Sequence, residues 1–254
     1  MTTHAASAGT ADSASGKMPS SLIIAIDGPA GAGKSTVARH LAARFGLLNL
    51  ETGAMYRAFA LKARREGVST DDTAALEMLA ARTVITLQPQ PEGNLVLLDG
   101  EDVTTLLRTP EVTDAASLVS VHPQIRTWMV ARQQQLGAAG GVVMEGRDIG
   151  TVVFPHADVK IFLDASPEVR GQRRFDQSGE QVGIPQTPSA RPSDEVAKDL
   201  RARDERDRNR AVSPLRPAAD AILLDSTYLT LAEVLEHAAA IVEEKLSGAS
   251  LSSS

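Results

Sequence analysis

A glycine-rich octapeptide near the N-terminus constrains the fold more than any other feature. Residues 28–35, Gly-Pro-Ala-Gly-Ala-Gly-Lys-Ser, match the pattern G-x-x-x-x-G-K-[ST] and directly follow the apolar run 22–26. Glycine tolerates backbone angles that other residues avoid, so such a loop turns tightly and directs successive N–H groups at anionic oxygens. Val37, Leu41 and Phe45 then recur at helical spacing, which brings the positive end of a helix to the same oxygens. Together these features predict a phosphate-binding loop and disfavour the alternative, a chance glycine-rich turn.

The last residues of this loop predict how a phosphate chain is held. Lys34 supplies a mobile positive charge for β and γ phosphate groups. The Ser35 hydroxyl is an oxygen ligand of the kind that Mg²⁺ accepts, so Ser35 is the predicted metal ligand. The residues expected to bind the phosphates are Gly28, Pro29, Ala30, Gly31, Ala32, Gly33, Lys34, Ser35 and Thr36.

Composition narrows the class of protein. A chain of 254 residues with 43% hydrophobic residues suits one α/β core that carries insertions. The absence of cysteine excludes disulfides and cysteine-based zinc sites, and no apolar run approaches the ~20 residues needed to cross a membrane. The net charge of −6 argues against a nucleic-acid binder, while five arginines between Arg201 and Arg210 favour a small anionic ligand. We expect a cytoplasmic enzyme, monomeric by default, without nucleic-acid or membrane partners.

The domain boundaries follow from composition. Residues 1–20 are rich in Ala, Ser, Thr and Gly without the apolar core of a signal peptide, and we expect them to form a disordered tail. The serine-rich residues 247–254 indicate a second disordered tail. One domain is therefore expected over residues 21–246.

The central part of the chain predicts a doubly wound fold. Short apolar runs at Val142–Met144, Val159–Leu163 and Ala221–Leu224 each stop at a carboxylate, as buried parallel strands would. Helical patterns separate or follow them at residues 124–136, 167–177, 194–209 and 230–245. We expect a three-layer α/β/α fold with a central parallel sheet, which binds its ligands at the carboxyl ends of the strands.

Two segments interrupt this alternation. The runs Thr83–Leu87 and Leu95–Leu98 flank a turn-rich stretch, which predicts a hairpin inside an inserted subdomain at about residues 70–115. The irregular stretch Ser178–Ser193 contains glycine, three prolines and polar residues just before the arginine-rich helix. It predicts a mobile lid, placed at about residues 177–210.

Arginines indicate a second substrate. Arg203, Asp207 and Arg210 are spaced to fall on one helix face. Taken alone they would indicate a solvated helix with ion pairs along it. However, Arg147 and Asp148 follow a buried strand, and Arg57 comes one helix after the phosphate loop. Several arginines converging on one cleft imply a second substrate that carries phosphate.

At this point the motifs resemble those of bacterial cytidylate kinases. The resemblance covers roughly residues 22–245 and rests on four segments: 28–35, 52–57, 146–155 and 206–215. It implies a core, a nucleoside-monophosphate-binding insert and a lid, with ATP as phosphoryl donor, Mg²⁺ as cofactor, and CMP or dCMP as acceptor. The last two segments are specific to this family, whereas the phosphate loop is not.

The same resemblance implies roles for individual residues. Cytosine offers an amino donor beside two acceptors, so its recognition needs a carboxylate or hydroxyl next to an arginine. By resemblance Asp148 and Ser117 accept from the amino group, and Arg126 donates to the ring. The remaining implied roles are contact with the acceptor phosphate (Arg57, Arg147, Arg210), contact near the ribose (Arg203, Asp207) and a substrate hydroxyl contact (Thr52). By pattern alone Ser117 and Arg126 would be structural residues.

The expected chemistry is in-line phosphoryl transfer. Lys34 and lid arginines, Arg208 and Arg173, are the expected catalytic residues, because the protein stabilises charge on the transferring group. An ionised phosphate acceptor needs no general base.

Three alternatives were weighed against this expectation. The nearest is a kinase for a different small acceptor, either another nucleotide or a hydroxylated metabolite. A hydroxyl acceptor would require a carboxylate base and fewer arginines. A guanine-reading switch would carry Asn-Lys-x-Asp, yet none of the three asparagines precedes a lysine. A purely structural role explains neither the loop nor the arginines.

Overall fold

The computed structural model describes residues 21–90, 93–180 and 193–251. The predicted N-terminal tail, residues 1–20, and most of the predicted lid stretch, residues 181–192, lie outside the described residues. At the other end, helix α8 (Leu231–Leu251) includes residues 247–251 of the segment expected to be a tail.

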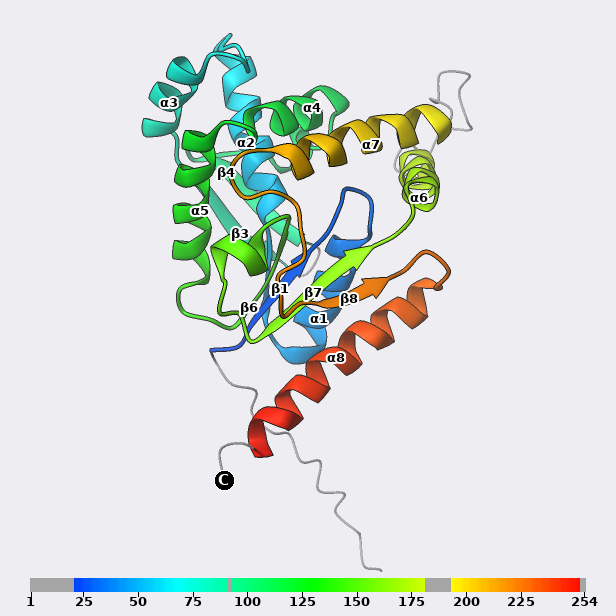
Figure 1. Ribbon diagram of the computed structural model, residues 1–254. Coiled ribbons are helices and arrows are strands. Elements are labelled where there is room, and N and C mark those ends of the chain that lie inside the picture. The colour runs from blue at the N-terminus through cyan, green and yellow to red at the C-terminus, as the bar shows by residue number, and fades with distance from the viewer. Residues whose placement is uncertain (1–20, 91–92, 181–192, 252–254) are drawn as a thin grey trace, which may run out of the picture.

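A parallel sheet forms the centre of the molecule (Figure 1). Every neighbouring pair of its strands runs parallel, and Ile23 to Asp27 pair in register with Val142 to Gly146. In spatial order the strands are β2 (Leu48–Glu51), β6 (Val142–Gly146), β1 (Ile23–Asp27), β7 (Val159–Asp164) and β8 (Ile222–Asp225). The first strand lies in the middle, so the phosphate loop emerges at the centre of the sheet edge.

Helices cover both faces of the sheet, which confirms the predicted three-layer α/β fold. Ile24 and Ile26 point to the face covered by α1 (Lys34–Phe45) and α8, whereas Ala25 points to the opposite face. That second face is covered by α2 (Thr52–Arg65), α4 (Pro110–Val119) and α5 (Pro123–Gly137). Alternate residues of one strand thus belong to two separate apolar clusters, as the period of a strand requires.

One strand of the sheet had no sequence signal. Strand β2 has the sequence Leu-Asn-Leu-Glu, and only Leu50 is fully buried. It is an edge strand, paired with β6 alone. A short, half-polar edge strand lacks the apolar run by which the other strands were predicted.

A second, antiparallel sheet contains the predicted hairpin. Strands β3 (Ile85–Gln90) and β4 (Gly93–Leu98) pair over their whole length, and β5 (Glu101–Asp102) adds to β4. Helix α3 (Thr73–Ala81) precedes the hairpin, and the short helix η1 (Thr104–Leu106) follows it. The Asn94 side chain connects this sheet to the main one: it accepts a hydrogen bond from Glu51 N at 2.8 Å and donates one to Asn49 O at 2.7 Å.

Three further elements lie around the carboxyl ends of the strands. A single π-helical turn, η2 (Ile149–Val153), follows β6. Helix α6 (Pro167–Glu180) follows β7 at the end to which its arrow points, and α7 (Ser193–Asn209) runs from there toward α4 (Figure 1). The helix predicted after the phosphate loop is α1, and the four later predicted helices correspond to α5, α6, α7 and α8, with ends that differ by a few residues.

Candidate functional site

The phosphate loop joins β1 to α1 at the centre of the sheet edge. Gly28 has a φ of 149°, and a Cβ atom built there would lie 2.0 Å from the carbonyl oxygen of Leu163. Only glycine permits this close passage of the loop over β7. The structure thus brings the nine predicted phosphate-binding residues, 28–36, to the carboxyl end of β1.

Lys34 is buried among charged groups at the start of α1. Its Nζ donates a hydrogen bond to the carbonyl oxygen of Pro29 at 2.7 Å. Burial and the nearby Arg147 guanidinium lower the pKa of Lys34 to about 7, against the opposing attraction of Glu145. An anionic ligand at this point would restore the charged form.

Asp27 connects the loop to the acceptor side of the cleft. Its carboxylate accepts hydrogen bonds from the backbone N–H groups of Ile149 at 2.8 Å and Gly150 at 2.7 Å. Burial raises the pKa of Asp27 to about 6, because these two hydrogen bonds only partly offset the loss of water. The strand that carries the phosphate loop is thereby fastened to the turn that follows Arg147 and Asp148.

The oxygens near Ser35 fit a magnesium ion. Oε1 of Glu145 is buried without a hydrogen-bond partner, while the Glu145 carboxylate has a hydrogen bond to the Ser35 side chain. Burial and the nearby Glu51 raise the pKa of Glu145. A hydroxyl and one or two carboxylate oxygens, completed by water and phosphate, are what Mg²⁺ uses in such sites. Among the described residues no group of three or more His, Cys, Asp or Glu forms an all-protein metal site.

Asp207 bridges two arginines of the cleft. Its carboxylate lies 3.0 Å from Nε of Arg147 and 3.3 Å from Nη1 of Arg210. Burial acts to raise the pKa of Asp207, but Arg147 and Arg210 outweigh it and hold that pKa below its usual value. Three residues that the sequence predicted to act together therefore lie in contact.

Asp148 lies close to Arg210 and forms an ion pair with Arg126. It accepts a 2.5 Å hydrogen bond from Nη2 of Arg126, and Nη2 of Arg210 lies 4.0 Å away. The Arg126 guanidinium stands 5.6 Å from the ring centre of Tyr56. Both Asp148 and Arg126 are buried, at 4% and 1% exposure. This is a desolvated donor and acceptor pair, flanked by an aromatic face.

Unpartnered polar atoms surround this pair. Buried atoms without a hydrogen-bond partner include Oγ of Ser117, the Tyr56 hydroxyl, Nε of Arg126 and Nη2 of Arg210. Buried polar atoms are normally paired, so these unpartnered atoms point to a polar ligand.

Arg57 and Thr52 lie at the start of α2. Arg57 forms an ion pair with Glu51, and the Thr52 hydroxyl donates to the carbonyl oxygen of Glu145 at 2.7 Å. Arg203 is half-buried on α7, and burial together with Arg147 lowers its pKa to about 10. Arg57 and Arg147 both act to lower the pKa of Arg203, so the three guanidinium groups are close enough to repel one another, and a phosphate bound near them would relieve that repulsion.

The two predicted lid arginines differ in their surroundings. Arg173 donates hydrogen bonds to the Ser226 hydroxyl at 3.0 Å and to its carbonyl oxygen at 2.8 Å. Arg208 is exposed and lines a cavity of about 740 Å³ between α7 and the segments after β7 and β8. Tyr228 and Thr227 lie on the opposite wall of this cavity.

Several residues of the site had no assigned role in the sequence. Tyr56, next to Arg57, supplies the aromatic face of the pocket, and burial raises its pKa to about 12. Glu145 supplies the carboxylate near Ser35. Arg170 and Asp204 form a buried ion pair beneath the phosphate loop. Tyr56 and Glu145 adjoin residues that were predicted, whereas Arg170 and Asp204 carry no sequence signal that separates them from their charged neighbours.

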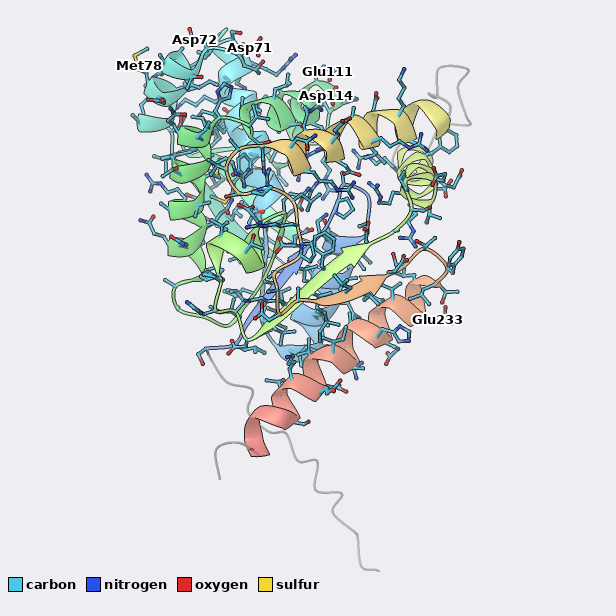
Figure 2. All side chains as sticks on the ribbon, viewed as in Figure 1. Asp71, Asp72, Met78, Glu111, Asp114 and Glu233 are labelled. Carbon is cyan, nitrogen blue, oxygen red and sulfur yellow. The ribbon has the colours of Figure 1, made fainter. Side chains whose placement is uncertain are left out.

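Some exposed carboxylates lie on or beside the helices of the predicted insert at about residues 70–115. Figure 2 labels Glu111 and Asp114 on α4, and Asp71 and Asp72 just before α3, at the upper end of the molecule. No helix in the described parts of the chain has the length and apolar character needed to cross a membrane.

Comparison with known proteins identifies relatives along almost the whole chain. A family model described as "Cytidylate kinase" matches residues 24–244. A cytidylate kinase of Solibacter usitatus is 48% identical over 225 residues, which cover 89% of this chain and 94% of that protein. One from Pelotomaculum thermopropionicum is 49% identical over 214 residues, covering 84% and 92%. One from Pasteurella multocida is 43% identical over 229 residues, covering 90% and 98%.

Proposed function

This chain belongs to the cytidylate kinase family, and from that premise we propose how its residues transfer a phosphoryl group from ATP to CMP. The reaction gives ADP and CDP. We include dCMP as an acceptor and Mg²⁺ as the cofactor. The observation that carries the proposal is the buried pair of Asp148 and Arg126, because it offers an acceptor and a donor side by side in a pocket with unpartnered polar atoms.

The acceptor base binds against this pair. The Asp148 carboxylate and the Ser117 hydroxyl accept from the exocyclic amino group of cytosine, and Arg126 donates to the ring. Uracil has a carbonyl oxygen in place of that amino group, so it would face a carboxylate without a proton between them. The cost of such an unpaired buried group is what separates CMP from UMP.

The acceptor phosphate binds among the arginines of the cleft. Arg57, Arg147 and Arg210 supply the donors, and a phosphate entering between them competes with Glu51 and Asp207 for their guanidinium groups. Arg203 and Asp207 lie next to the ribose, and the Thr52 hydroxyl contacts the substrate. Since the acceptor oxygen is already ionised at neutral pH, no general base is required.

The donor binds on the phosphate loop. Residues 28–36 surround its phosphates, and Lys34 in its charged form stabilises the β and γ groups. Ser35 and Glu145 would hold Mg²⁺, which neutralises charge on the transferring phosphoryl group. The cavity lined by Arg208, Thr227 and Tyr228 is a suitable volume for the base and ribose of ATP.

The arginines beside the donor act when the cleft is closed. We propose that Arg208 and Arg173 turn toward the transferring phosphoryl group, with the lid at about residues 177–210 and the acceptor insert at about residues 70–115 closing over the substrates. Closure excludes water, which would otherwise hydrolyse the donor. Substitution of Arg208 by alanine should lower kcat by at least about 100-fold, whereas a near-normal kcat would remove Arg208 from the mechanism. We expect the enzyme to act as a cytoplasmic monomer.

A coupled assay of ADP release tests the function. With ATP and Mg²⁺ present, the acceptor panel comprises CMP, dCMP, UMP, AMP, GMP and shikimate. Turnover on CMP and dCMP that exceeds every other acceptor is the expected result. Faster turnover on another acceptor, or only slow ATP hydrolysis without an acceptor, would leave the phosphate loop in place and remove the cytosine pocket from the proposal.

A further inference from the structure

A buried ion pair joins the two helices that follow β7 and precede β8. Arg170 on α6 and Asp204 on α7 approach to 2.6 Å, and both residues are only 2% exposed. The contact is not aligned as a hydrogen bond, since Oδ2 of Asp204 remains without a hydrogen-bond partner, so attraction between the charges carries it. Neither residue belongs to the acceptor pocket described above.

Both charged groups also hold the same residue of the phosphate loop. Oδ1 of Asp204 accepts a hydrogen bond from the backbone N–H of Ala30 at 3.3 Å. Nη1 of Arg170 donates to the carbonyl oxygen of Ala30 at 2.8 Å, while its Nε donates to Ala165 O at 2.9 Å. The pair therefore fixes both backbone groups of Ala30, and joins the loop to α7 and to the end of β7.

Helix packing alone does not require this pair. At Gly171 the two helices already approach so closely that an added Cβ would lie 2.8 Å from Cβ of Ala197. A buried ion pair gives little net stability compared with well-packed apolar residues of similar volume, because both charges must lose water. What distinguishes Arg170 and Asp204 from apolar side chains is their ability to bind the backbone of Ala30.

Helix α7 carries the acceptor side of the reaction. Arg203 immediately precedes Asp204, and Asp207 stands one turn further along, where it holds Arg147 and Arg210. A movement of α7 relative to the phosphate loop would displace these groups from the donor phosphates. In-line transfer depends on that alignment, and a misplacement of about 1 Å costs on the order of 100-fold in rate.

We propose that Arg170 and Asp204 are positioning residues, which fix the acceptor-binding face of α7 at a set distance from the phosphate loop through Ala30. The inference rests on the proposed function, because it gives the pair a role in aligning donor and acceptor phosphates. Both residues lie in the wall of the cavity proposed for the base and ribose of ATP, but they are only 2% exposed and contact each other and Ala30. Loss of the pair should therefore disturb the alignment more than it disturbs either binding step.

The first test is substitution of Asp204 by asparagine in the full chain. The isosteric amide removes the charge and keeps the volume. We expect kcat with CMP to fall at least about 30-fold, with KM for CMP and for ATP each within about threefold, because the substitution disturbs the alignment of the two phosphates and not the groups proposed to bind them. An unchanged kcat, or a loss confined to either KM, would overturn the proposal.

The matched control is Glu168→Gln. Glu168 and Arg201 form another ion pair between α6 and α7, but their side chains are exposed and the pair does not hold the backbone of Ala30. We expect this variant to keep kcat within about twofold, because exposed pairs contribute little. If it lost as much kcat as Asp204→Asn, a general loosening of the two helices would replace the specific role of Ala30.

A second variant separates positioning from stability. Arg170→Met combined with Asp204→Leu removes both charges without leaving either unpaired, so folding is retained while the contacts to Ala30 are lost. We expect it to unfold in one cooperative thermal transition, as a folded protein does, and its kcat to remain low. If the double variant had the kcat of the wild type, the proposal would be overturned. This test remains decisive even if Asp204→Asn alone does not fold.

Binding of a covalently linked ATP–CMP analogue gives an independent readout. The analogue needs both sites at a fixed separation, so its affinity should fall at least about 30-fold in the double variant while CMP alone binds within about threefold of the wild type. Equal losses for the analogue and for CMP would contradict a positioning role. Failure of the wild type to phosphorylate CMP would instead remove the proposed function itself, so the two failures are distinguishable.

Discussion

Lys34 shows how burial prepares a single side chain for its ligand. Its pKa of about 7 lies far below the value of 10.5 for a free lysine. Between these two pH values the unfolded chain binds a proton that the folded protein lacks, so the contribution of Lys34 to stability increases as pH rises through that window. Phosphate oxygens favour the protonated lysine, and ligand binding should therefore raise its pKa.

This reasoning predicts proton uptake on binding. At about pH 8.5 a non-hydrolysable ATP analogue should take up close to one proton as it binds, and at about pH 6 Lys34 should contribute none, because it is already charged. Isothermal titration calorimetry in buffers of different ionisation enthalpy measures the number of protons taken up on binding. Binding enthalpies at the higher pH that do not depend on the buffer would contradict the low pKa of Lys34.

Asp148 supports a second prediction about a single residue. Asp148→Asn leaves the buried Arg126 charge unpaired and replaces one acceptor oxygen by a donor. We expect kcat/KM for CMP to fall at least about 100-fold and the preference for CMP over UMP to narrow, because an amide can donate to a carbonyl oxygen.

Kinetics with CMP and UMP, each at saturating ATP, provide the measurement. The control is Asp114→Asn, which removes an exposed carboxylate on α4 (Figure 2). It should change neither kcat/KM for CMP nor the preference for CMP over UMP. An unaltered CMP preference in the Asp148 variant would argue against its contact with the base.

Contacts between side chains could be predicted from the sequence where helical spacing and a position after a buried strand both placed the residues in the same cleft. Asp207 and Arg210 lie three residues apart on one helix, and Arg147 reaches them from the end of a buried strand. The direction of side chains on α6 was not predictable in this way. Arg170, Arg173 and Arg174 are close neighbours in sequence, yet Arg170 lies under the phosphate loop and Arg173 contacts Ser226. Their separation depends on how α6 packs on α7 and on the loop after β8.

At the scale of elements, Asn94 deserves a test because one side chain joins two sheets. Its amide satisfies a backbone donor and a backbone acceptor of β2, which ends next to Thr52. Asn94→Leu removes both hydrogen bonds, and each backbone group left unpaired costs about 1–3 kcal/mol. We expect KM for CMP to rise at least about tenfold while KM for ATP stays within about twofold, because the phosphate loop lies on β1.

Steady-state kinetics with each substrate varied in turn measure these two constants. Gln88→Leu serves as the control, since Gln88 is exposed on β3 of the same hairpin. A parallel rise in both constants would show that Asn94 supports the whole fold and not the acceptor side.

Elements with a long or strongly apolar pattern were predicted, and β2 was not. The buried strands β1, β6 and β7 have nearly continuous apolar residues because helices cover both of their faces. Strand β2 is held by its pairing with β6 and by a hydrogen bond from the Asn94 amide, and the four residues of β2 predict neither contact. An apolar sequence pattern predicts a buried strand, but β2 depends on contacts with β6 and Asn94, which its own sequence does not reveal.

At the scale of the whole molecule, the sheet divides the apolar core into two clusters, and we expect mutations in the two clusters to affect CMP binding differently. Leu41 on α1 and Ile125 on α5 are both fully buried, one on each side. Truncation of either to alanine should lower the free energy of unfolding by about 2–5 kcal/mol. Only Ile125→Ala should also raise KM for CMP, because Ile125 directly precedes Arg126 on α5.

Urea unfolding and CMP kinetics on the two variants test this division. Each variant serves as the control for the other, since the volume removed is alike. Equal changes in KM for CMP would mean that both clusters support the acceptor pocket to the same degree.

The pairing of arginines with carboxylates in the cleft has a consequence for how long product stays bound. Arg57, Arg126 and Arg147 each have a carboxylate of the protein within reach: Glu51, Asp148 and Asp207. In the proposed mechanism these cations return to their internal partners when CDP departs, so no buried charge is left unpaired. Release of CDP therefore replaces one anionic partner of these arginines by another, which keeps the residence time of CDP short. A strongly cationic cleft can then release CDP even though it carries more negative charge than CMP.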